Sequence, residues 1–401
     1  MNALFALILI GALGFILGRF LFLKPRPGSL LQRVFLSGLE FLLLGALIGP
    51  RGVRLLGEEE LTSLEPFLLL SLTWVGLLVG LQLRVGQLVR FPPAYFRLAL
   101  IQSLAALAFA FALLGAVLHL WNPFASDASD RLRAALCLGA VAALSSPTEA
   151  ALHARGARGG RAAGLLRFVP AIDPLVALGA TAALFAVWHV ADAGGLRAFQ
   201  PWMWVLVSLA GGLLLGLLFL LLLRAAEGQD EIVLVVIGMA IFTGGLASVF
   251  HLSPLVVGLV EGVLLANLFS RVEALIHIFL RMERPLYVAL LVLAGAAWRF
   301  DLPWGYVLAA IYLAVRLLAK YAGARLALAA VTLPFRPGGR WWLGLMPQGA
   351  MAVAIAVSYG LVYRDALSQS VFSAVLVSTV LLSLLSGRLM ARALPEGEET
   401  G

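Results

Sequence analysis

Asp173 is the side chain in this sequence best placed to bind a small cation or a proton. It lies in AIDPLVAL, about ten residues, or ~15 Å of helix, inside an apolar segment, which is the depth of the middle of a ~30 Å hydrocarbon layer. A carboxylate there costs roughly 2.5–3.5 kcal/mol on insertion scales, so it is a functional candidate. It can bind Na⁺, K⁺ or a proton, one at a time. The alternative is a structural acid paired with a buried arginine.

Prolines flank this acid on both sides. Pro170 and Pro174 lack backbone N–H groups, which frees the carbonyls of Leu166 and Pro170, and the residue before a proline is disfavoured in helical geometry. We therefore expect the helix to be irregular at Asp173. Free carbonyls beside a carboxylate suit a hard cation.

A second proline-interrupted segment, LSSPTEAALHARG, precedes Asp173 in the chain. Pro147 breaks it and frees one backbone carbonyl. Ser146, Thr148 and Glu149 supply oxygen atoms beside the break, and with Asp173 they are the candidate ligands for an ion or a proton. Two interpretations of Glu149 remain open. It approaches Asp173 across the short loop, or it lies near the cytoplasmic mouth and attracts cations.

Two basic residues lie inside a later apolar segment. Arg316 and Lys320 are four residues apart, so they share one helix face, and one of them is expected to pair with an acid or with the carbonyl ends of broken helices. Snorkelling to the interface is the alternative for Lys320. Glu261 is a further intramembrane acid, and Gln348 follows the proline of a second break at Pro347. We expect electrostatic or structural roles for these residues.

The composition indicates the class of protein. Hydrophobic residues make up 62% of the 401 positions and charged residues 12%, a balance typical of polytopic helical membrane proteins. The net charge of +8 comes from arginines clustered in short loops beside apolar segments, which indicates membrane topology rather than nucleic-acid binding. The single cysteine excludes an intramolecular disulfide. Motifs of intramembrane enzymes and the P-loop are absent from the sequence, so we expect neither an enzyme nor a cofactor.

Apolar windows predict about thirteen membrane-spanning helices. The first lacks the basic start and the small-residue cleavage site of a signal peptide, so we interpret it as a membrane helix. The amphipathic stretch 271–284 is either an interfacial helix or an extension of its neighbours. The predicted spans lie near 3–23, 34–49, 61–83, 94–120, 131–152, 163–190, 202–223, 231–250, 254–270, 285–299, 303–328, 340–361 and 367–390.

The two breaks fall seven spans apart, and an odd offset inverts the orientation. This predicts two inverted six-helix repeats, 1–190 and 231–390, joined by a linking helix at 202–223. Two broken helices would cross where a transporter binds its substrate. The chain, 1–401, is then one transmembrane domain without a soluble regulatory domain. Basic residues concentrate in alternate loops, which places the N-terminus outside and the C-terminus in the cytoplasm.

These motifs resemble those of the monovalent cation–proton antiporter superfamily, which has the sodium/proton exchanger fold. The resemblance covers nearly the whole chain. LSSPTEAALHARGARG is similar to the first broken helix of that family, AIDPLVAL to the helix with the ion-binding aspartate, VRLLAKYAGARL to the basic helix and GLMPQGAMAVAIA to the second broken helix. Four positions differ. Ile172 replaces an Asn or Asp, Glu149 an aspartate, Gln348 an arginine and Glu261 a small residue.

The resemblance implies a homodimeric secondary antiporter that exchanges Na⁺ or K⁺ for protons by alternating access across a cell inner membrane. Spans four to six and eleven to thirteen would form a moving core, and the other spans a scaffold. Because Ile172 removes the second acid beside Asp173, we expect electroneutral exchange. Two alternatives remain: a channel or another ion carrier on the same fold, and a membrane sensor or assembly protein.

Overall fold

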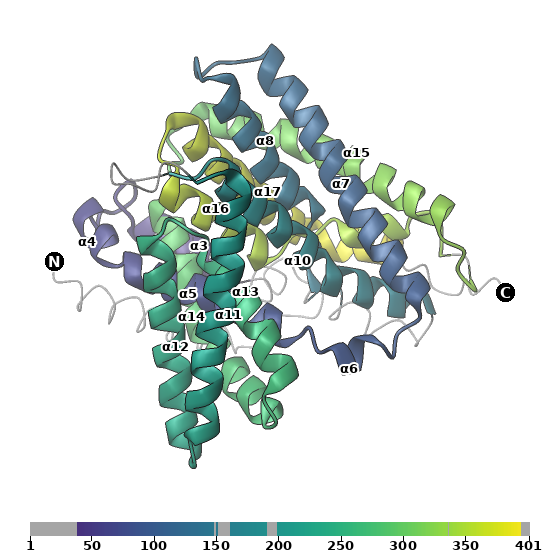
Figure 1. Ribbon diagram of the computed structural model, residues 1–401. Helices are drawn as coiled ribbons and strands as arrows, with labels where there is room; N and C mark the ends of the chain where they lie inside the picture. Colours follow the sequence, from purple (N-terminus) through teal and green to yellow (C-terminus); the bar gives the residue numbers. More distant parts are fainter. Residues whose placement is uncertain (1–37, 148–149, 151–160, 191–198, 336, 394–401) are drawn as a thin grey trace, which may run out of the picture. The chain divides into compact units, whose positions relative to one another are not determined.

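A computed structural model describes residues 38–147, 150, 161–190, 199–335 and 337–393, and every regular element in these ranges is a helix (Figure 1). Each predicted span from the second to the thirteenth corresponds to a helix, and the first lies outside the described residues. The helices that correspond to spans are α3 (Leu39–Ile48), α5 (Glu65–Leu81), α7 (Pro93–Leu120), α8 (Ala128–Ala143), α10 (Arg161–Val187), α11 (Pro201–Ala225), α12 (Gln229–Val249), α13 (Pro254–Leu268), α14 (Val272–Ala297), α15 (Pro303–Ala330), α16 (Ala350–Val362) and α17 (Ala366–Ala393). Shorter elements are α4 (Glu58–Ser63), α6 (Val85–Leu88) and the 3₁₀ helix η2 (Trp341–Leu345).

Six of these helices are long and apolar enough to cross a membrane by themselves: α7, α10, α11, α12, α15 and α17. Three shorter helices, α5, α13 and α16, are also apolar. A helix rises ~1.5 Å per residue, so about 20 residues cross the hydrocarbon layer. The architecture is therefore that of an all-α polytopic membrane protein.

The amphipathic stretch 271–284 is continuous with the span predicted near 285–299, and it does not form a separate interfacial helix. Helix α14 runs without interruption from Val272 to Ala297 and includes Pro285. Its first half carries the polar face that made the stretch amphipathic, and its second half is mostly buried.

The helices group into two compact units, and each unit draws on both halves of the sequence. Among the described residues, the first unit holds 40–90 and 181–298, with α5 and α11 to α14. The second unit holds 91–180 and 299–393, with α7, α8, most of α10, α15, η2, α16 and α17. The second unit thus contains spans four to six and eleven to thirteen, the spans that the resemblance assigns to a core.

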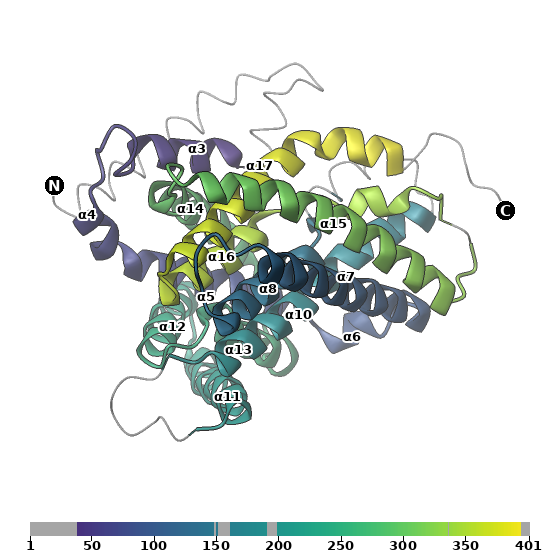
Figure 2. The ribbon, with the colours of Figure 1, turned by 90° about the horizontal axis from the view of Figure 1, so that it is seen from above.

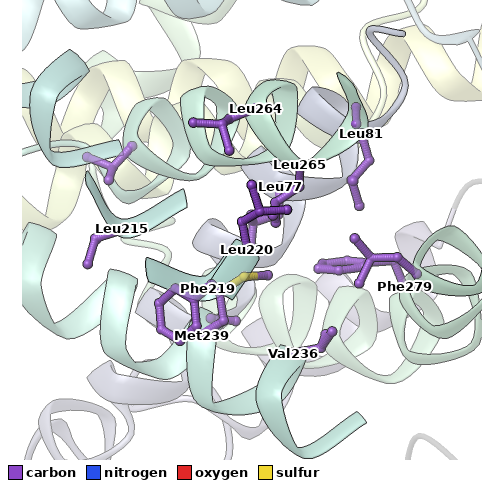
Figure 3. Close-up of a cluster of buried hydrophobic side chains, with 14 of the residues drawn as sticks. Leu77, Leu81, Leu215, Phe219, Leu220, Val236, Met239, Leu264, Leu265 and Phe279 are labelled. Carbon is purple, nitrogen blue, oxygen red and sulfur yellow. The ribbon is translucent and has the colours of Figure 1, made fainter. Parts of the chain in front are cut away.

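The first unit is built around an apolar cluster shared by α5 and α11 to α14 (Figure 3). Leu77 from α5, Leu220 from α11 and Met239 from α12 point into this cluster. Helices α5 and α13 approach each other very closely at Gly80. A Cβ atom added there would lie only 2.4 Å from the backbone carbonyl oxygen of Leu259. Small residues at such contacts let helix backbones pack closely in lipid.

The second unit repeats one arrangement of helices. Helices α7 and α15 lie side by side, each has 28 residues and each begins at a proline (Figures 1 and 2). Helices α8 and α10 follow α7, as the interrupted η2–α16 segment and α17 follow α15. A Cβ atom on Gly323 of α15 would lie 2.7 Å from the carbonyl oxygen of Gln102 on α7, so this helix pair is in close contact. The helices of this unit therefore follow the same order in its two halves.

Candidate ion-binding site

Both predicted breaks are present in the second unit. Helix α8 ends at Ala143, the chain is non-helical at Leu144, Ser145 and Ser146, and helical structure resumes at Pro147. In the second half, η2 ends at Leu345, and α16 begins at Ala350 after four non-helical residues that include Pro347. Proline lacks the N–H that would continue the helical ladder, which explains why both breaks lie at prolines.

The two breaks are in direct contact with each other. The backbone N–H of Ser146 donates a hydrogen bond of 2.7 Å to the carbonyl oxygen of Pro347. Gly349 has a φ of +68°, and a Cβ atom there would lie 2.9 Å from Oγ of Ser146. Glycine tolerates this left-handed backbone and leaves room for Ser146. The broken helices therefore cross at their non-helical residues.

Arg316 of α15 joins the two breaks. Its side chain is 0% exposed. Its guanidinium donates hydrogen bonds to the carbonyl oxygens of Val141 at 2.9 Å, Ala142 at 3.0 Å and Leu144 at 2.7 Å in the first break, and to that of Met346 at 2.8 Å in the second. The carbonyl end of a helix carries partial negative charge, which a buried cation compensates. Arg316 thus satisfies the carbonyl ends of the broken helices.

Lys320 lies one turn further along α15 and is also 0% exposed. Its ammonium donates hydrogen bonds to the carbonyl oxygen of Ala143 at 2.7 Å and to Oγ of Ser145 at 2.9 Å, and it lies 3.4 Å from Oδ2 of Asp173. Ala143 is the residue whose carbonyl Pro147 frees, so this carbonyl accepts from Lys320. The alternative in which Lys320 snorkels to the interface is wrong, because the ammonium is buried and bonded.

Asp173 completes the cluster from α10 and is 0% exposed. Ser145 donates a hydrogen bond of 2.5 Å to its Oδ2 atom, and Ser103 of α7 donates one to its Oδ1 atom. The carboxylate therefore contacts two hydroxyl groups and one ammonium. Its cationic partner is Lys320 and not an arginine, which was the partner expected if Asp173 were a purely structural acid.

The helix that carries Asp173 is regular, and the expectation of an irregular helix at the acid was wrong. Helix α10 continues through Pro170 and Pro174 to Val187. Each proline removes only its own N–H from the ladder, and the residues around Asp173, such as Ile172 and Ala177, are buried. Packing in the second unit thus outweighs the local preference of the residue before a proline.

Known proteins support this architecture through structure rather than through sequence. No family model and no curated protein matched the chain. One solved structure of the sodium proton antiporter MjNhaP1 from Methanocaldococcus jannaschii, at pH 8, aligns over 98% of this chain and 99% of its own with a TM-score of 0.70 and 17% identity. An electron-microscopy structure of the same antiporter aligns over 100% of both chains with a TM-score of 0.62 and 16% identity. The chain has the sodium/proton antiporter fold.

Within the antiporter fold, the other predicted site residues lie at different places. Gln348 is buried in the second break, where its amide donates to Ser378 at 3.3 Å and accepts from Thr379 at 3.2 Å. Glu261 belongs to the first unit, where its Oε2 atom accepts from Thr243 at 2.9 Å. Ser146 takes part in the crossing of the breaks through its backbone. The remaining two, Thr148 and Glu149, lie outside the described residues.

Two polar residues near this site, Gln102 and Ser103 on α7, were not predicted from the sequence. Both side chains are 0% exposed, and Ser103 contacts Asp173. A signal was present in the sequence. These two residues interrupt the middle of the apolar run RLALIQSLAALAFAF with adjacent hydrogen-bonding side chains. Buried polar side chains in a membrane helix usually have partners within the protein.

Proposed function

We propose that this protein exchanges a monovalent cation, Na⁺ or K⁺, for a proton across a membrane, and that the Asp173–Lys320 pair is the exchange site. One observation carries the proposal. The ammonium of Lys320 lies among three oxygen atoms: the carbonyl of Ala143, the hydroxyl of Ser145 and the carboxylate of Asp173. The fold of the sodium proton antiporter MjNhaP1 supports the same reading.

These three oxygens are the kind of ligands that a hard metal cation prefers. Carboxylate, carbonyl and hydroxyl oxygens coordinate such ions, and an ammonium group takes the place of a monovalent cation in the same set. In the proposed cycle, the transported cation replaces the ammonium of Lys320 between Ala143, Ser145 and Asp173. Competition between the two cations for one set of oxygens is sufficient for exchange.

Charge balance sets the proposed stoichiometry. The Asp173–Lys320 pair is neutral when the carboxylate is ionised and the ammonium is protonated. If one monovalent cation enters and one proton leaves the pair, the site stays neutral, and exchange is one for one. The proton is assigned to the pair rather than to either residue, because the two charged groups are in contact.

Arg316 has a different role in this proposal. Its contacts are with the carbonyl oxygens of both breaks. An arginine side chain stays protonated in proteins, so it keeps a fixed positive charge at the crossing throughout the cycle. Arg316 would hold the two breaks together while the Asp173–Lys320 pair gains and loses its proton.

Everted membrane vesicles with a pH-sensitive dye test the proposal. Addition of Na⁺, K⁺ or Li⁺ should cause proton efflux from vesicles that contain the wild-type protein, and Asp173→Asn should abolish it without loss of expression. A channel would pass cations without coupled proton movement, and a sensor or assembly protein would give no flux. Wild-type exchange by Asp173→Asn would contradict the assignment of the site.

The proposed setting is a cell inner membrane, with the N-terminus outside, the C-terminus in the cytoplasm and two copies of the chain per transporter. The distribution of basic residues supports the orientation, and the resemblance to the antiporter superfamily supports the homodimer. The second unit, which contains the exchange site, would move relative to the first to give alternating access. Native mass spectrometry of the protein in detergent tests the oligomeric state.

A further inference from the structure

The side chain of Gln102 is buried next to the exchange site, and its hydrogen bonds are incomplete. It is 0% exposed, on α7 of the second unit. Its Oε1 atom lies 3.5 Å from Oγ of Ser103, which in turn contacts Asp173. Its Nε2 atom has no hydrogen-bond partner among the described residues. An amide N–H₂ group buried without an acceptor is costly.

The hydroxyl of Ser103 cannot serve both of its contacts as a donor. Ser103 faces two acceptors in this arrangement, the Oδ1 atom of Asp173 and the Oε1 atom of Gln102. A serine hydroxyl has one proton to donate and two lone pairs that accept. The closer contact is with the ionised carboxylate, and hydrogen bonds to charged acceptors are the stronger ones. Ser103 therefore donates to Asp173, and the contact with Gln102 requires a donor from Gln102.

Turning the amide of Gln102 by 180° resolves both conflicts. The O and N atoms of an amide are assigned from the hydrogen-bond network. In the turned orientation, the N–H₂ group of Gln102 donates to Ser103, and Ser103 donates to Asp173. The amide oxygen then takes the position without a partner. An under-satisfied carbonyl oxygen is better tolerated in a protein interior than an unpaired N–H.

We propose that the amide oxygen of Gln102 is a ligand of the transported cation and contributes to its affinity and selectivity. This inference rests on the proposed exchange at Asp173. A cation that replaces the ammonium of Lys320 needs several oxygen ligands at once. Gln102 provides a buried neutral oxygen on the residue that precedes Ser103, and its N–H₂ group orients Ser103 toward Asp173.

The position of Gln102 is fixed by the backbone. The backbone carbonyl oxygen of Gln102 would lie 2.7 Å from a Cβ atom added to Gly323. Helix α7 therefore packs directly against α15, the helix that carries Lys320. The backbone that carries the Gln102 amide is therefore held in place beside α15, which favours discrimination between cations of different radius.

Cation binding by the purified full-length protein in detergent tests the inference. Isothermal titration calorimetry with NaCl and with KCl gives a dissociation constant for each ion, and thermal unfolding of the same samples reports stability. Gln102→Leu removes the oxygen at similar volume and should raise the Kd about tenfold, the factor that corresponds to ~1.4 kcal/mol, the order of one hydrogen-bonding contact. The Na⁺ to K⁺ ratio of Kd values should change as well. Gln102→Met removes both amide atoms from an unbranched side chain of similar length and should raise the Kd in the same way.

Ser370→Ala is the matched control, since Ser370 is a buried residue of the second unit whose hydroxyl bonds only to the Ala366 carbonyl of its own helix, at 3.0 Å. It should leave both dissociation constants unchanged. Gln102→Leu with a wild-type Kd and a wild-type ion ratio would overturn the inference, even if its Tm falls, because that result describes a structural residue. If Gln102→Leu does not fold, a wild-type Kd and a wild-type ion ratio for Gln102→Met overturn it equally. These results leave the proposed function intact, whereas a wild-type protein that binds and exchanges no cation contradicts both.

Discussion

Replacement of Arg316 by alanine is expected to destabilise the protein more than any other single truncation in the second unit. At 3.0 Å or less, the guanidinium donates to four buried carbonyl oxygens, those of Val141, Ala142, Leu144 and Met346. Each buried acceptor that loses its donor costs ~1 kcal/mol or more, so the loss of all four should cost about 4 kcal/mol. The hydrocarbon layer of a membrane offers no other donor for these carbonyls.

The assay is reversible unfolding of the purified protein in mixed micelles, followed by helicity, with the free energy of unfolding compared between variants. Arg325→Ala is the control on the same helix. Arg325 is exposed and lies 6.0 Å from the ring of Tyr321, so its removal should change stability by less than ~0.5 kcal/mol. Arg316→Lys should fall between wild type and Arg316→Ala, since one ammonium cannot reach the carbonyls of both breaks.

Exchange activity should be lost together with stability in Arg316→Ala, because the two breaks then separate and Lys320 no longer lies between Ala143 and Asp173. Two results would refute the reasoning. One is an Arg316→Ala protein as stable as wild type. The other is a Lys320→Ala protein less stable than Arg316→Ala, since Lys320 donates to only one carbonyl of the breaks.

Further predictions concern the crossing of the breaks, the coupling ratio and the topology. Gly349→Ala should cost about 1–3 kcal/mol of stability because of its positive φ and its contact with Ser146. Gly338→Ala, where no atom lies within 4 Å of the added Cβ, should be neutral in the same unfolding assay. In proteoliposomes at a fixed pH difference, the cation gradient at which net flux vanishes should not respond to a clamped membrane potential. Transfer of one net charge per cycle would instead shift that gradient by well over tenfold per 100 mV, from roughly 2.3 kcal/mol per charge. With Cys137 replaced, a cysteine introduced at Arg158 should react with impermeant reagents only from the cytoplasmic side, and one at Asp127 only from outside; the opposite pattern would reverse the proposed orientation.

The sequence determined the positions of the helices and of their breaks. A membrane helix needs about 20 apolar residues, so the apolar runs predicted each described span before any contact was known. A proline removes one hydrogen bond from a helical ladder, so Pro147 and Pro347 indicated two breaks, although Pro170 and Pro174 lie within the continuous helix α10. The cost of a carboxylate in hydrocarbon singled out Asp173 for the same kind of reason, since the depth of a residue within an apolar segment can be read from the sequence.

The tertiary structure alone decided which side chains meet at that carboxylate. Lys320 and Ser103 are separated from Asp173 by 147 and 70 residues of sequence, and no periodicity connects them. The sequence left open whether Arg316 or Lys320 would pair with an acid, and it gave no role to Gln102. It also predicted an irregular helix at Asp173, because the preference of a residue before proline is local, whereas the packing that keeps α10 continuous comes from the helices of the second unit. Contacts of this kind depend on how the helices pack against one another. Local patterns in one sequence do not show that packing, because it is set by all the helices together.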